Sequence, residues 1–391
     1  MNDQFYLNPK ITYLNHGSFG ACPKPIFEDY QKWQLELEQE PVKFITVSSP
    51  KYLKNSKLAL AEFIKCNADD FVYVANPSTA FNIVIKNLKL NAGDEILTTN
   101  HEYGAMDRTW NYYCKKAGAK YVQQSISLPL NSKEQFIEEF WKGLTKNTKI
   151  IFISQITSPT ALIFPVKEIC EKAKELGLMT IVDGAHVPVH VPLNLAELKA
   201  DIYTGACHKW MLTPKGCSFL YVKKELQDLF DPLVISWGYE AEFPSHSKFL
   251  DYHEYQGTRD ISAYLTVPKA LEFLKKNNWP EKSKICRDLI KETYIEACQL
   301  LNTKPICKVS DEFLGQMCSI PIKSSDLLKL KEVLYNEYSI EVPLMKTLLS
   351  FNGNANQQFL RISAQVYNSK KDMQTLFDAL IKIKKTSSLI E

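Results

Sequence analysis

Short apolar segments alternate with helical patterns along residues 70–222, and this alternation restricts the possible folds more than any other feature of the chain. Many segments are rich in β-branched and aromatic residues, as buried strands are. Strands separated by helices form mostly parallel sheets flanked by those helices. We predict an α/β sheet of seven strands, at residues 71–75, 95–99, 120–124, 149–154, 179–182, 202–205 and 218–222. The intervening helices are predicted at residues 79–88, 105–117, 132–144 and 166–176.

The pattern changes after residue 260, where a long helical stretch precedes an α+β segment. The helix is predicted at residues 263–276, strands near 315–320 and 359–363, and a last amphipathic helix at 369–385. A chain of 391 residues is also long for a single domain. We therefore expect an N-terminal arm, a large domain and a smaller C-terminal domain, at residues 1–20, 21–262 and 263–391.

Charge and cysteine usage narrow the possible partners. The net charge is only +3 and no basic run stands out, so neither nucleic acid nor a membrane is an expected partner. The ten cysteines form no Cys-x-x-Cys pair, which argues against a zinc site and a redox dithiol. With no apolar run at the N-terminus, we expect a cytoplasmic protein with reduced thiols and a small-molecule ligand.

Two polar residues are predicted to meet at the carboxyl edge of the sheet. Asp183 ends the strand at residues 179–182, and Lys209 follows the next strand, 26 residues later. Open α/β sheets bind ligands at this edge. A lysine can form a Schiff base with pyridoxal phosphate, and a carboxylate can keep its pyridine nitrogen protonated. The pair predicts a site for this cofactor, with Lys215 as the rival lysine in a Pro-Lys-Gly turn.

Other polar residues follow strands at the same edge. Ser78 and Thr79 open a helix, where backbone N–H groups can bind a phosphate, although a simple helix cap would also explain them. His101 follows the strand at residues 95–99 and can stack on the cofactor ring, unless it is an ordinary loop histidine. His186 can approach the phenolic oxygen of the ring or make a structural hydrogen bond.

Ser158 and Arg361 are candidate contacts for the substrate. Ser158 lies in a loop after the strand at residues 149–154, where its hydroxyl can orient a ligand or simply form a turn. Arg361 lies within an apolar strand, so its guanidinium needs either a substrate carboxylate or a structural acid. We expect Arg259, by contrast, to pair with a local acid such as Asp260.

With these residues in view, the chain resembles the class V aminotransferase superfamily of fold-type I pyridoxal phosphate enzymes, and within it the isopenicillin N epimerase-like group. The resemblance runs nearly end to end. It rests on Leu14–Gly20, His101–Ala105, Thr157–Ala161, Asp183–His186, His208–Trp210, Gly257–Asp260 and Arg361–Ser363 followed by Tyr367-Asn368.

The resemblance implies roles for these residues. Lys209 would hold the cofactor covalently, Asp183 would pair with the pyridinium, His101 would stack on the ring and Arg361 would clamp the substrate carboxylate. The phosphate contacts would be Ser78, Thr79 and His208, with Thr258 reaching the phosphate of the neighbouring subunit. The functional unit would therefore be a homodimer with a shared active site.

The reaction is less constrained than the cofactor. Cysteine desulfurases of this superfamily carry a cysteine shortly before the carboxylate-binding arginine, but residues 339–359 contain none, so a persulfide mechanism is disfavoured. A C–S lyase acting on an L-α-amino acid can use Lys209 alone. An epimerase needs a second acid, for which Tyr103 and His16 are the candidates. We expect one of these two reactions, with an aminotransferase or a non-catalytic cofactor-binding protein as alternatives.

Overall fold

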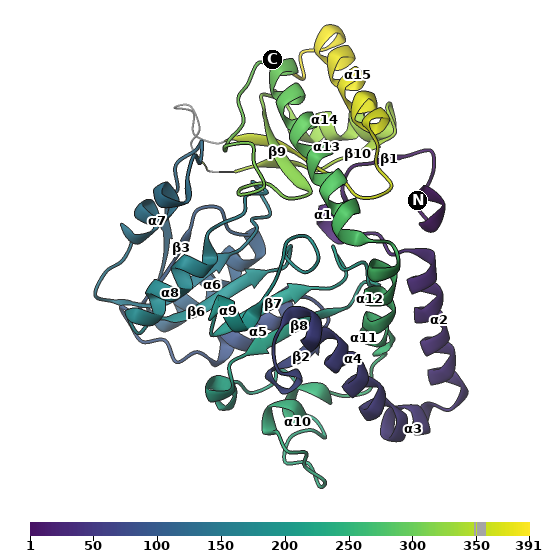
Figure 1. The fold of residues 1–391 in the computed structure, drawn as a ribbon. Coiled ribbons are helices and arrows are strands. Elements are labelled where there is room, and N and C mark those ends of the chain that lie inside the picture. Colours follow the sequence, from purple (N-terminus) through teal and green to yellow (C-terminus); the bar gives the residue numbers. More distant parts are fainter. Residues whose placement is uncertain (348, 350–356) are drawn as a thin grey trace.

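The computed structural model describes residues 1–347, 349 and 357–391. Its main feature is the seven-stranded sheet predicted from the sequence, in the order β2-β8-β7-β6-β5-β3-β4 (Figure 1). The strand β8 runs antiparallel to both of its neighbours, while the strands from β7 to β4 are parallel. The bounds are β2 (Phe71–Val74), β3 (Glu95–Thr99), β4 (Lys120–Gln124), β5 (Thr148–Ser154), β6 (Met179–Gly184), β7 (Ile202–Ala206) and β8 (Ser218–Val222).

Apolar side chains point to both faces of the strands and form two hydrophobic cores, one on each face of the sheet. Ile151 and Ile153 of β5 belong to the larger core, and Ile150 and Phe152 of the same strand belong to the other. Successive side chains of a strand point to opposite faces, which explains this division. A sheet buried on both faces needs helices over each of them. The predicted helices are confirmed as α5 (Pro77–Asn87), α6 (Gly104–Ala117), α7 (Lys133–Trp141) and α8 (Val166–Glu175).

The C-terminal part contains a second, antiparallel sheet of three strands in the order β11-β12-β9. Two of them, β9 (Met317–Ile322) and β12 (Gln358–Ser363), confirm the predicted strands, and β11 (Leu344–Lys346) is additional. The helices beside this sheet are α13 (Trp279–Leu300), α14 (Leu327–Asn336) and the predicted last helix, α15 (Lys370–Thr386) (Figure 1).

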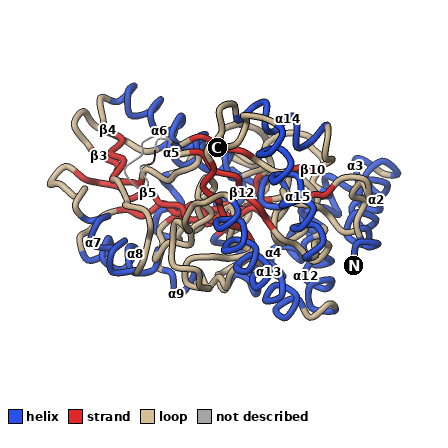
Figure 2. The backbone as a smooth tube through the Cα atoms, turned by 90° about the horizontal axis from the view of Figure 1, so that it is seen from above, coloured by secondary structure: helices blue, strands red, loops and turns tan. Residues whose placement is uncertain are grey.

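The N-terminal segment contacts both halves of the chain. The strand β1 (Thr12–Tyr13) pairs with β10 (Ile340–Glu341), which attaches the expected arm to the C-terminal part. The helices α2 (Lys24–Gln39) and α4 (Ser49–Ile64) pack against α12 (Val267–Lys276). Figure 2 shows α2 and α4 on the side of the molecule opposite β3 and β4. The boundaries of the arm and the two domains stay predictions.

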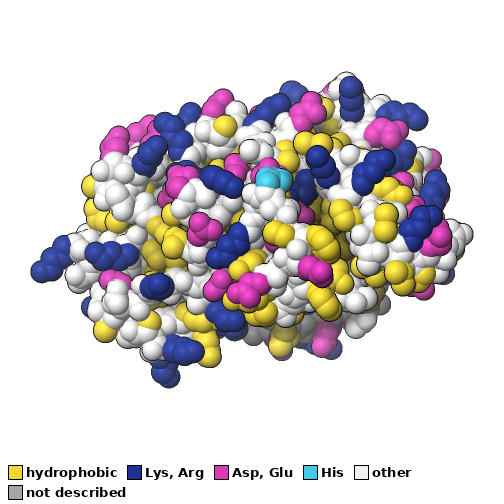
Figure 3. Space-filling model, turned by 90° about the horizontal axis from the view of Figure 1, so that it is seen from below, with side chains coloured by type: hydrophobic (Ala, Val, Ile, Leu, Met, Phe, Trp, Pro, Cys, Tyr) yellow, Lys and Arg dark blue, Asp and Glu magenta, His cyan; other side chains and the backbone are white. Residues whose placement is uncertain are grey.

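The surface carries charges of both signs. On the face shown in Figure 3, lysine and arginine side chains are interspersed with aspartate and glutamate, and hydrophobic patches lie between them. No helix in the described part of the chain is long and apolar enough to span a membrane.

Candidate active site

A cavity of about 350 Å³ lies at the carboxyl edge of the parallel strands, where the sequence predicts the site. Its size falls within the usual range for small-molecule pockets. A larger cavity of about 970 Å³, between α4, α12 and α13, lacks the lysine and aspartate that predict the cofactor. The smaller cavity is lined by Gly17, Ser18, Phe19, Asn76, Pro77, Ser78, Tyr103, Met106, Ser154, Ile156, Ser158, Asp183, Ala185, His186, His208, Lys209 and Arg361.

The sheet itself brings Asp183 and Lys209 to this cavity. Asp183 lies opposite Ser154 on the neighbouring strand β5, near the carboxyl ends of both strands. Lys209 lies in the connection between β7 and β8, which are antiparallel neighbours. The backbone N–H groups of Cys207 and His208 both donate to the carbonyl oxygen of Cys217, each at 3.1 Å, and close that connection. The position of Lys209 is therefore set by strand pairing.

The Lys209 amine is in an environment that favours its neutral form. Burial lowers its pKa to about 8, against the attraction of Asp183 and with a contribution from the Arg361 charge. About a tenth of the amine is then unprotonated at pH 7, far more than for an exposed lysine. The unprotonated amine is the nucleophile that a carbonyl cofactor requires.

Lys215, the rival lysine, occupies a different position. Its amine donates a hydrogen bond to the carbonyl oxygen of Gly20 at 3.0 Å, and it lines a separate cavity with Cys22 and Pro214. The structure thus brings Lys209, and not Lys215, together with Asp183.

The Asp183 carboxyl group fits a cationic ring nitrogen. It is buried, and one oxygen accepts a hydrogen bond from the backbone N–H of Ala185 at 2.8 Å. In the described part of the chain, no lysine or arginine forms an ion pair with it, and burial raises its pKa. A pyridinium would supply the missing positive partner. The chemistry of these side chains therefore suits pyridoxal phosphate.

The start of α5 lies at the cavity, where the phosphate contacts are expected, but one of the expected residues does not line it. Ser78 lines the cavity beside the helix N-terminus, and His208 lines it from the β7–β8 connection. Thr79 does not line it, because its hydroxyl and its backbone N–H both donate to the Asn76 side chain, at 3.1 and 2.9 Å. Thr79 therefore acts here as part of a helix cap, which was the simpler of its two expected roles.

Arg361 reaches the cavity from the smaller sheet. Its Nη1 donates to the carbonyl oxygen and the hydroxyl of Ser158, at 2.7 and 3.0 Å, and its Nη2 donates to the Ser18 hydroxyl at 2.9 Å. No acidic side chain in the described part of the chain pairs with it. Burial lowers its pKa to about 10, so it stays protonated near neutral pH. Of the two expected partners, the structural acid is absent among the described residues, and a substrate carboxylate remains.

His101 lies outside the cavity lining, contrary to the expected stacking position. It is fully buried, with Nδ1 3.0 Å from the Thr160 hydroxyl and Nε2 3.3 Å from the carbonyl oxygen of Ile126. Tyr103, two residues later, lines the cavity instead. The reason is local: α6 begins at Gly104, so its N-cap residue, Tyr103, turns toward the ligand edge.

His16 is also enclosed by protein. Its Nδ1 lies 2.8 Å from the Tyr367 hydroxyl and its Nε2 lies 3.1 Å from the carbonyl oxygen of Lys209. The next residues of the short helix α1 (His16–Phe19) line the cavity in its place. With both ring nitrogens occupied, His16 is poorly placed to exchange protons with a substrate.

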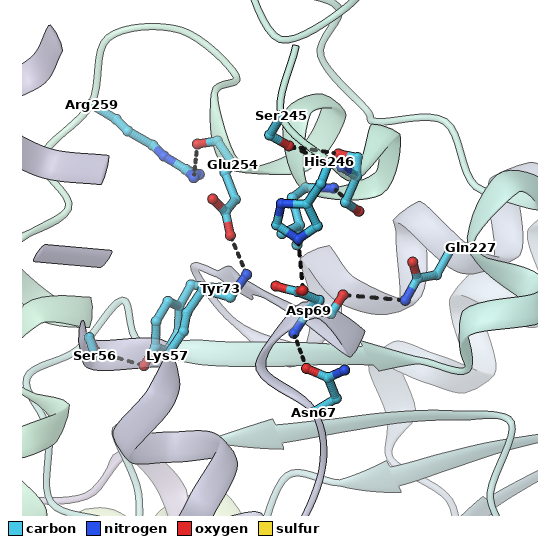
Figure 4. A network of polar contacts seen from close by, with 12 residues as sticks. Ser56, Lys57, Asn67, Asp69, Tyr73, Gln227, Ser245, His246, Glu254 and Arg259 are labelled. Atoms are coloured by element: carbon cyan, nitrogen blue, oxygen red, sulfur yellow. Dashed lines mark hydrogen bonds and ion pairs between the residues drawn. The ribbon is translucent and has the colours of Figure 1, made fainter. Parts of the chain in front are cut away.

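Thr258 is exposed and does not line this cavity, so its expected contact with the phosphate of a neighbouring subunit stays a prediction. The segment before it is anchored by a largely buried ion pair, in which the Lys57 amine lies 2.5 Å from the carboxylate of Glu254 at the end of α10 (Lys248–Glu254) (Figure 4). The expected pairing of Arg259 with Asp260 is wrong. Arg259 donates to the carbonyl oxygen of Glu254 at 3.2 Å, as Figure 4 shows.

The structure adds a buried carboxyl group that sequence reasoning missed. Glu102 accepts hydrogen bonds from the Thr99 hydroxyl and from the hydroxyl and backbone N–H of Ser154. Burial raises its pKa to about 8, and the nearby Asp183 acts in the same direction. Glu102 therefore supports Ser154, which lines the cavity. Glu102 lies between the candidates His101 and Tyr103 in the sequence, and nothing in this position predicts its burial.

Around one cavity of an open α/β sheet lie a buried lysine and, among the described residues, an aspartate and an arginine without ion-pair partners, and this set suits a pyridoxal cofactor and an amino acid. The chain belongs to the aminotransferase class-V family, which matches residues 30–376. This confirms the resemblance seen in the sequence.

Named relatives agree with this assignment. The chain is 28% identical to an isopenicillin N epimerase of Amycolatopsis lactamdurans, over 98% of each chain. It is also 28% identical to a putative L-cysteine desulfhydrase 1 of Oryza sativa subsp. japonica, over 95% of this chain and 83% of the relative. A cysteine desulfurase of Thermococcus onnurineus NA1, solved in its apo form, has the same fold with a TM-score of 0.81 at 19% identity, over 98% of this chain and 97% of that one.

Proposed function

We propose that this protein is a pyridoxal phosphate-dependent C–S lyase that acts on a cysteine-derived L-α-amino acid. The class V family and the cavity chemistry support the cofactor and an amino-acid substrate. The observation that carries the choice of reaction is the position of His16. Both of its ring nitrogens are occupied, so one of the two candidate second acids is removed, and a lyase needs only Lys209.

Each residue of the cavity has a task in this proposal. The bound cofactor supplies an electron sink for the substrate's Cα. Lys209 would hold the cofactor covalently and take up the Cα proton, while Asp183 would keep the proton on the ring nitrogen. Ser78 and the start of α5 would hold the phosphate. Arg361 binds the substrate carboxylate through its planar fork and so orients the Cα–H bond toward Lys209.

The reaction balances without an oxidant or reductant. The proton leaves Cα, the Cβ–S bond breaks and the sulfur departs with the bonding electron pair. After addition of water, L-cysteine yields pyruvate, ammonia and hydrogen sulfide. The persulfide route stays disfavoured because residues 339–359 contain no cysteine, although residues 348 and 350–356 of that segment lie outside the described part of the structure.

Epimerisation is the second candidate, and a specific residue favours it. Tyr103 lines the cavity, and its phenol is half-exposed. Its hydroxyl is the remaining candidate for the second acid, which would return a proton to the face of Cα opposite Lys209. The isopenicillin N epimerase similarity adds support for this reaction.

One experiment separates the two reactions. Purified protein loaded with cofactor is incubated with L-cysteine, S-alkyl-cysteines and non-sulfur L-amino acids, while pyruvate, ammonia and substrate chirality are followed. Pyruvate and ammonia in equal amounts from the cysteine derivatives support the lyase. Inversion without pyruvate overturns it in favour of the epimerase, and Tyr103→Phe should then abolish the inversion. Lyase activity, in contrast, should persist in Tyr103→Phe.

We propose further that the functional unit is a homodimer in which Thr258 reaches the partner's phosphate site. A row of apolar side chains between residues 233 and 244 supports this, since Trp237 is 79% and Phe243 is 87% exposed. Exposed apolar patches mark contact surfaces. Sedimentation equilibrium should show a dimer that Trp237→Ser with Phe243→Ser weakens and that Tyr112→Ser, at an exposed site on α6, leaves intact. A monomeric wild-type protein would contradict the proposal.

We also propose that the protein works in the cytoplasm. All ten cysteines are free thiols, and most are buried. Such usage suits a reducing compartment. Immunofluorescence or cell fractionation of the native protein would test this location directly.

A further inference from the structure

The inference starts from the hydrogen-bond partners of His186, which lies between Lys209 and Trp210. The Nε2 atom of His186 is 3.2 Å from the Lys209 amine. Its Nδ1 atom is 3.4 Å from the indole nitrogen of Trp210. Both ring nitrogens therefore have a partner, and the chemistry of those partners decides where the ring proton lies.

An indole N–H can only donate a hydrogen bond. Nδ1 of His186 must consequently be the acceptor of the bond from Trp210. The neutral ring then carries its proton on Nε2, since one nitrogen of a neutral imidazole donates and the other accepts. The Nε2–H group in turn needs an acceptor. The neutral amine of Lys209 offers a lone pair, whereas the ammonium form offers only N–H groups.

The indole of Trp210 is held firmly in this orientation. The side chain is 1% exposed, and its ring stacks on that of His190 with centroids 3.9 Å apart. His190 is itself fixed, because the backbone N–H of Gln316 donates to its Nε2 and its Nδ1 lies 2.9 Å from the carbonyl oxygen of His186. The ring of His16 packs on Trp210 from another side, at 4.9 Å.

We propose that Trp210 is a positioning residue that fixes His186 with its proton on Nε2, so that the imidazole donates a hydrogen bond into the cavity beside Lys209. In the protein without cofactor, this donor stabilises the neutral, nucleophilic amine of Lys209. Its consequence for the bound cofactor rests on the function proposed above, because the same N–H group would then meet the phenolic oxygen of the ring. The proton position itself does not depend on the reaction.

The surrounding charges are consistent with a neutral His186. Burial, followed by the charges of Lys209 and Arg361 and by His190 and His16, holds the pKa of His186 well below its usual range. Asp183 acts on the neighbouring Lys209, whose pKa it raises against the effect of burial. These groups come from four different parts of the chain and enclose the imidazole. His186 therefore has no tendency to become an imidazolium, which would donate from both nitrogens.

The direct test is nitrogen NMR of the apoprotein labelled with ¹⁵N-histidine. The chain has seven histidines, and His186→Gln identifies the His186 signals by their loss. We expect the wild-type His186 to show a protonated Nε2 and an unprotonated Nδ1. The opposite pattern in the wild type would overturn the proposal without any further variant.

A second test removes the indole N–H and keeps an aromatic ring. In Trp210→Phe, His186 becomes free to place its proton on Nδ1 and to accept from the Lys209 ammonium. Labelling of Lys209 by a short pulse of pyridoxal phosphate and borohydride, followed by peptide mass spectrometry, should be roughly fivefold slower at pH 7, as expected for the net effect of one hydrogen bond. The pH at which labelling is half-maximal should rise.

Trp279→Phe is the matched control. Trp279 is also buried, at 4% exposure, but its indole nitrogen has no hydrogen-bond partner among the described residues. This variant should leave the His186 signals and the labelling profile of Lys209 unchanged. Equal behaviour of Trp210→Phe and wild type in both measurements would refute the proposal. If the His186 signals and the Lys209 labelling behave as expected but the protein does not cleave cysteine derivatives, the role of Trp210 stands and only the proposed function is refuted.

Discussion

Arg361 donates two hydrogen bonds to Ser158, one to its carbonyl oxygen at 2.7 Å and one to its hydroxyl at 3.0 Å, although Arg361 lies in β12 of the small sheet and Ser158 lies in the loop after β5 of the large one. The bonds fix the guanidinium at the junction of the large sheet and the small one. Its positive charge stays without an acidic partner in the described part of the chain. A buried cation of this kind is stabilised when a carboxylate arrives.

We therefore predict that Arg361→Lys weakens substrate binding even though the charge is kept. A lysine cannot make the paired, planar hydrogen bonds of the guanidinium to a carboxylate. The half-saturating substrate concentration, followed through the absorbance of the cofactor, should rise by roughly tenfold, equivalent to about 1.4 kcal/mol. Decarboxylated amine analogues should bind poorly to the wild type. Equal binding of substrate by both proteins would show that Arg361 is only structural.

Lys209→Ala should abolish the covalent adduct that borohydride fixes on the wild-type protein. The amine of Lys209 shares a cavity with Asp183, whereas that of Lys215 is bonded to the carbonyl oxygen of Gly20. Lys215→Ala is the control and should keep the adduct. Peptide mass spectrometry after reduction identifies the modified residue. An adduct of normal yield in Lys209→Ala would move the assignment to another lysine.

Asp183→Asn should retain the cofactor and lose turnover by about 10²-fold or more, the usual effect of removing one strong electrostatic contact from a reacting centre. The amide cannot hold the proton on the ring nitrogen. Asp201→Asn is a suitable control, because Asp201 precedes β7 at the other edge of the sheet and pairs with Lys223. Cofactor content and turnover are measured together. Near-normal turnover in Asp183→Asn would remove this carboxylate from the mechanism.

The stability of the apoprotein should rise with pH because of Lys209. The folded state holds this amine with a pKa of about 8, while the unfolded chain releases the proton near pH 10.4. Between these two values the unfolded state binds more protons, so the free energy of unfolding increases with pH. Lys209→Met should accordingly be more stable than wild type below pH 8, by about 3 kcal/mol. Denaturant unfolding at pH 7 and pH 10.5 would show this difference shrinking, and a constant difference would contradict it.

The strands of the large sheet could be predicted because their apolar segments are short, β-branched and bounded by turns. The N-terminal helices, such as α2, could not be predicted in this way. In α2 only Ile26 is buried, so its sequence shows a mostly polar pattern that a surface loop shares. The helix α13 was also missed, although it has 22 residues. Its buried positions pack against β9, a contact made only in the folded chain.

The site was predictable where strand order alone decides the geometry, as for Asp183 and Lys209. The site was not predictable where the conformation of a loop determines which side chain lines the cavity. His101 and Tyr103 both follow β3, and the start of α6 at Gly104 determines that Tyr103 lines the cavity. The bonds of Thr79 to Asn76 likewise depend on the cap geometry. The residue types alone predict neither which of His101 and Tyr103 lines the cavity nor which atoms Thr79 bonds.

The short connection between β7 and β8 has a consequence for redesign of the chain. The backbone N–H groups of Cys207 and His208 both donate to the carbonyl oxygen of Cys217, so the two ends of the connection that carries Lys209 are held together. A circular permutant opened between residues 207 and 217 should lose the reactive amine's position even if the sheet still forms. New termini near Gly93 should be tolerated, since that residue has open space around it and lies in a turn before the amino end of β3, whereas the cavity lies at the carboxyl edge of the sheet. We therefore expect new chain termini to be tolerated in the turn at Gly93 but not in the β7–β8 connection that carries Lys209.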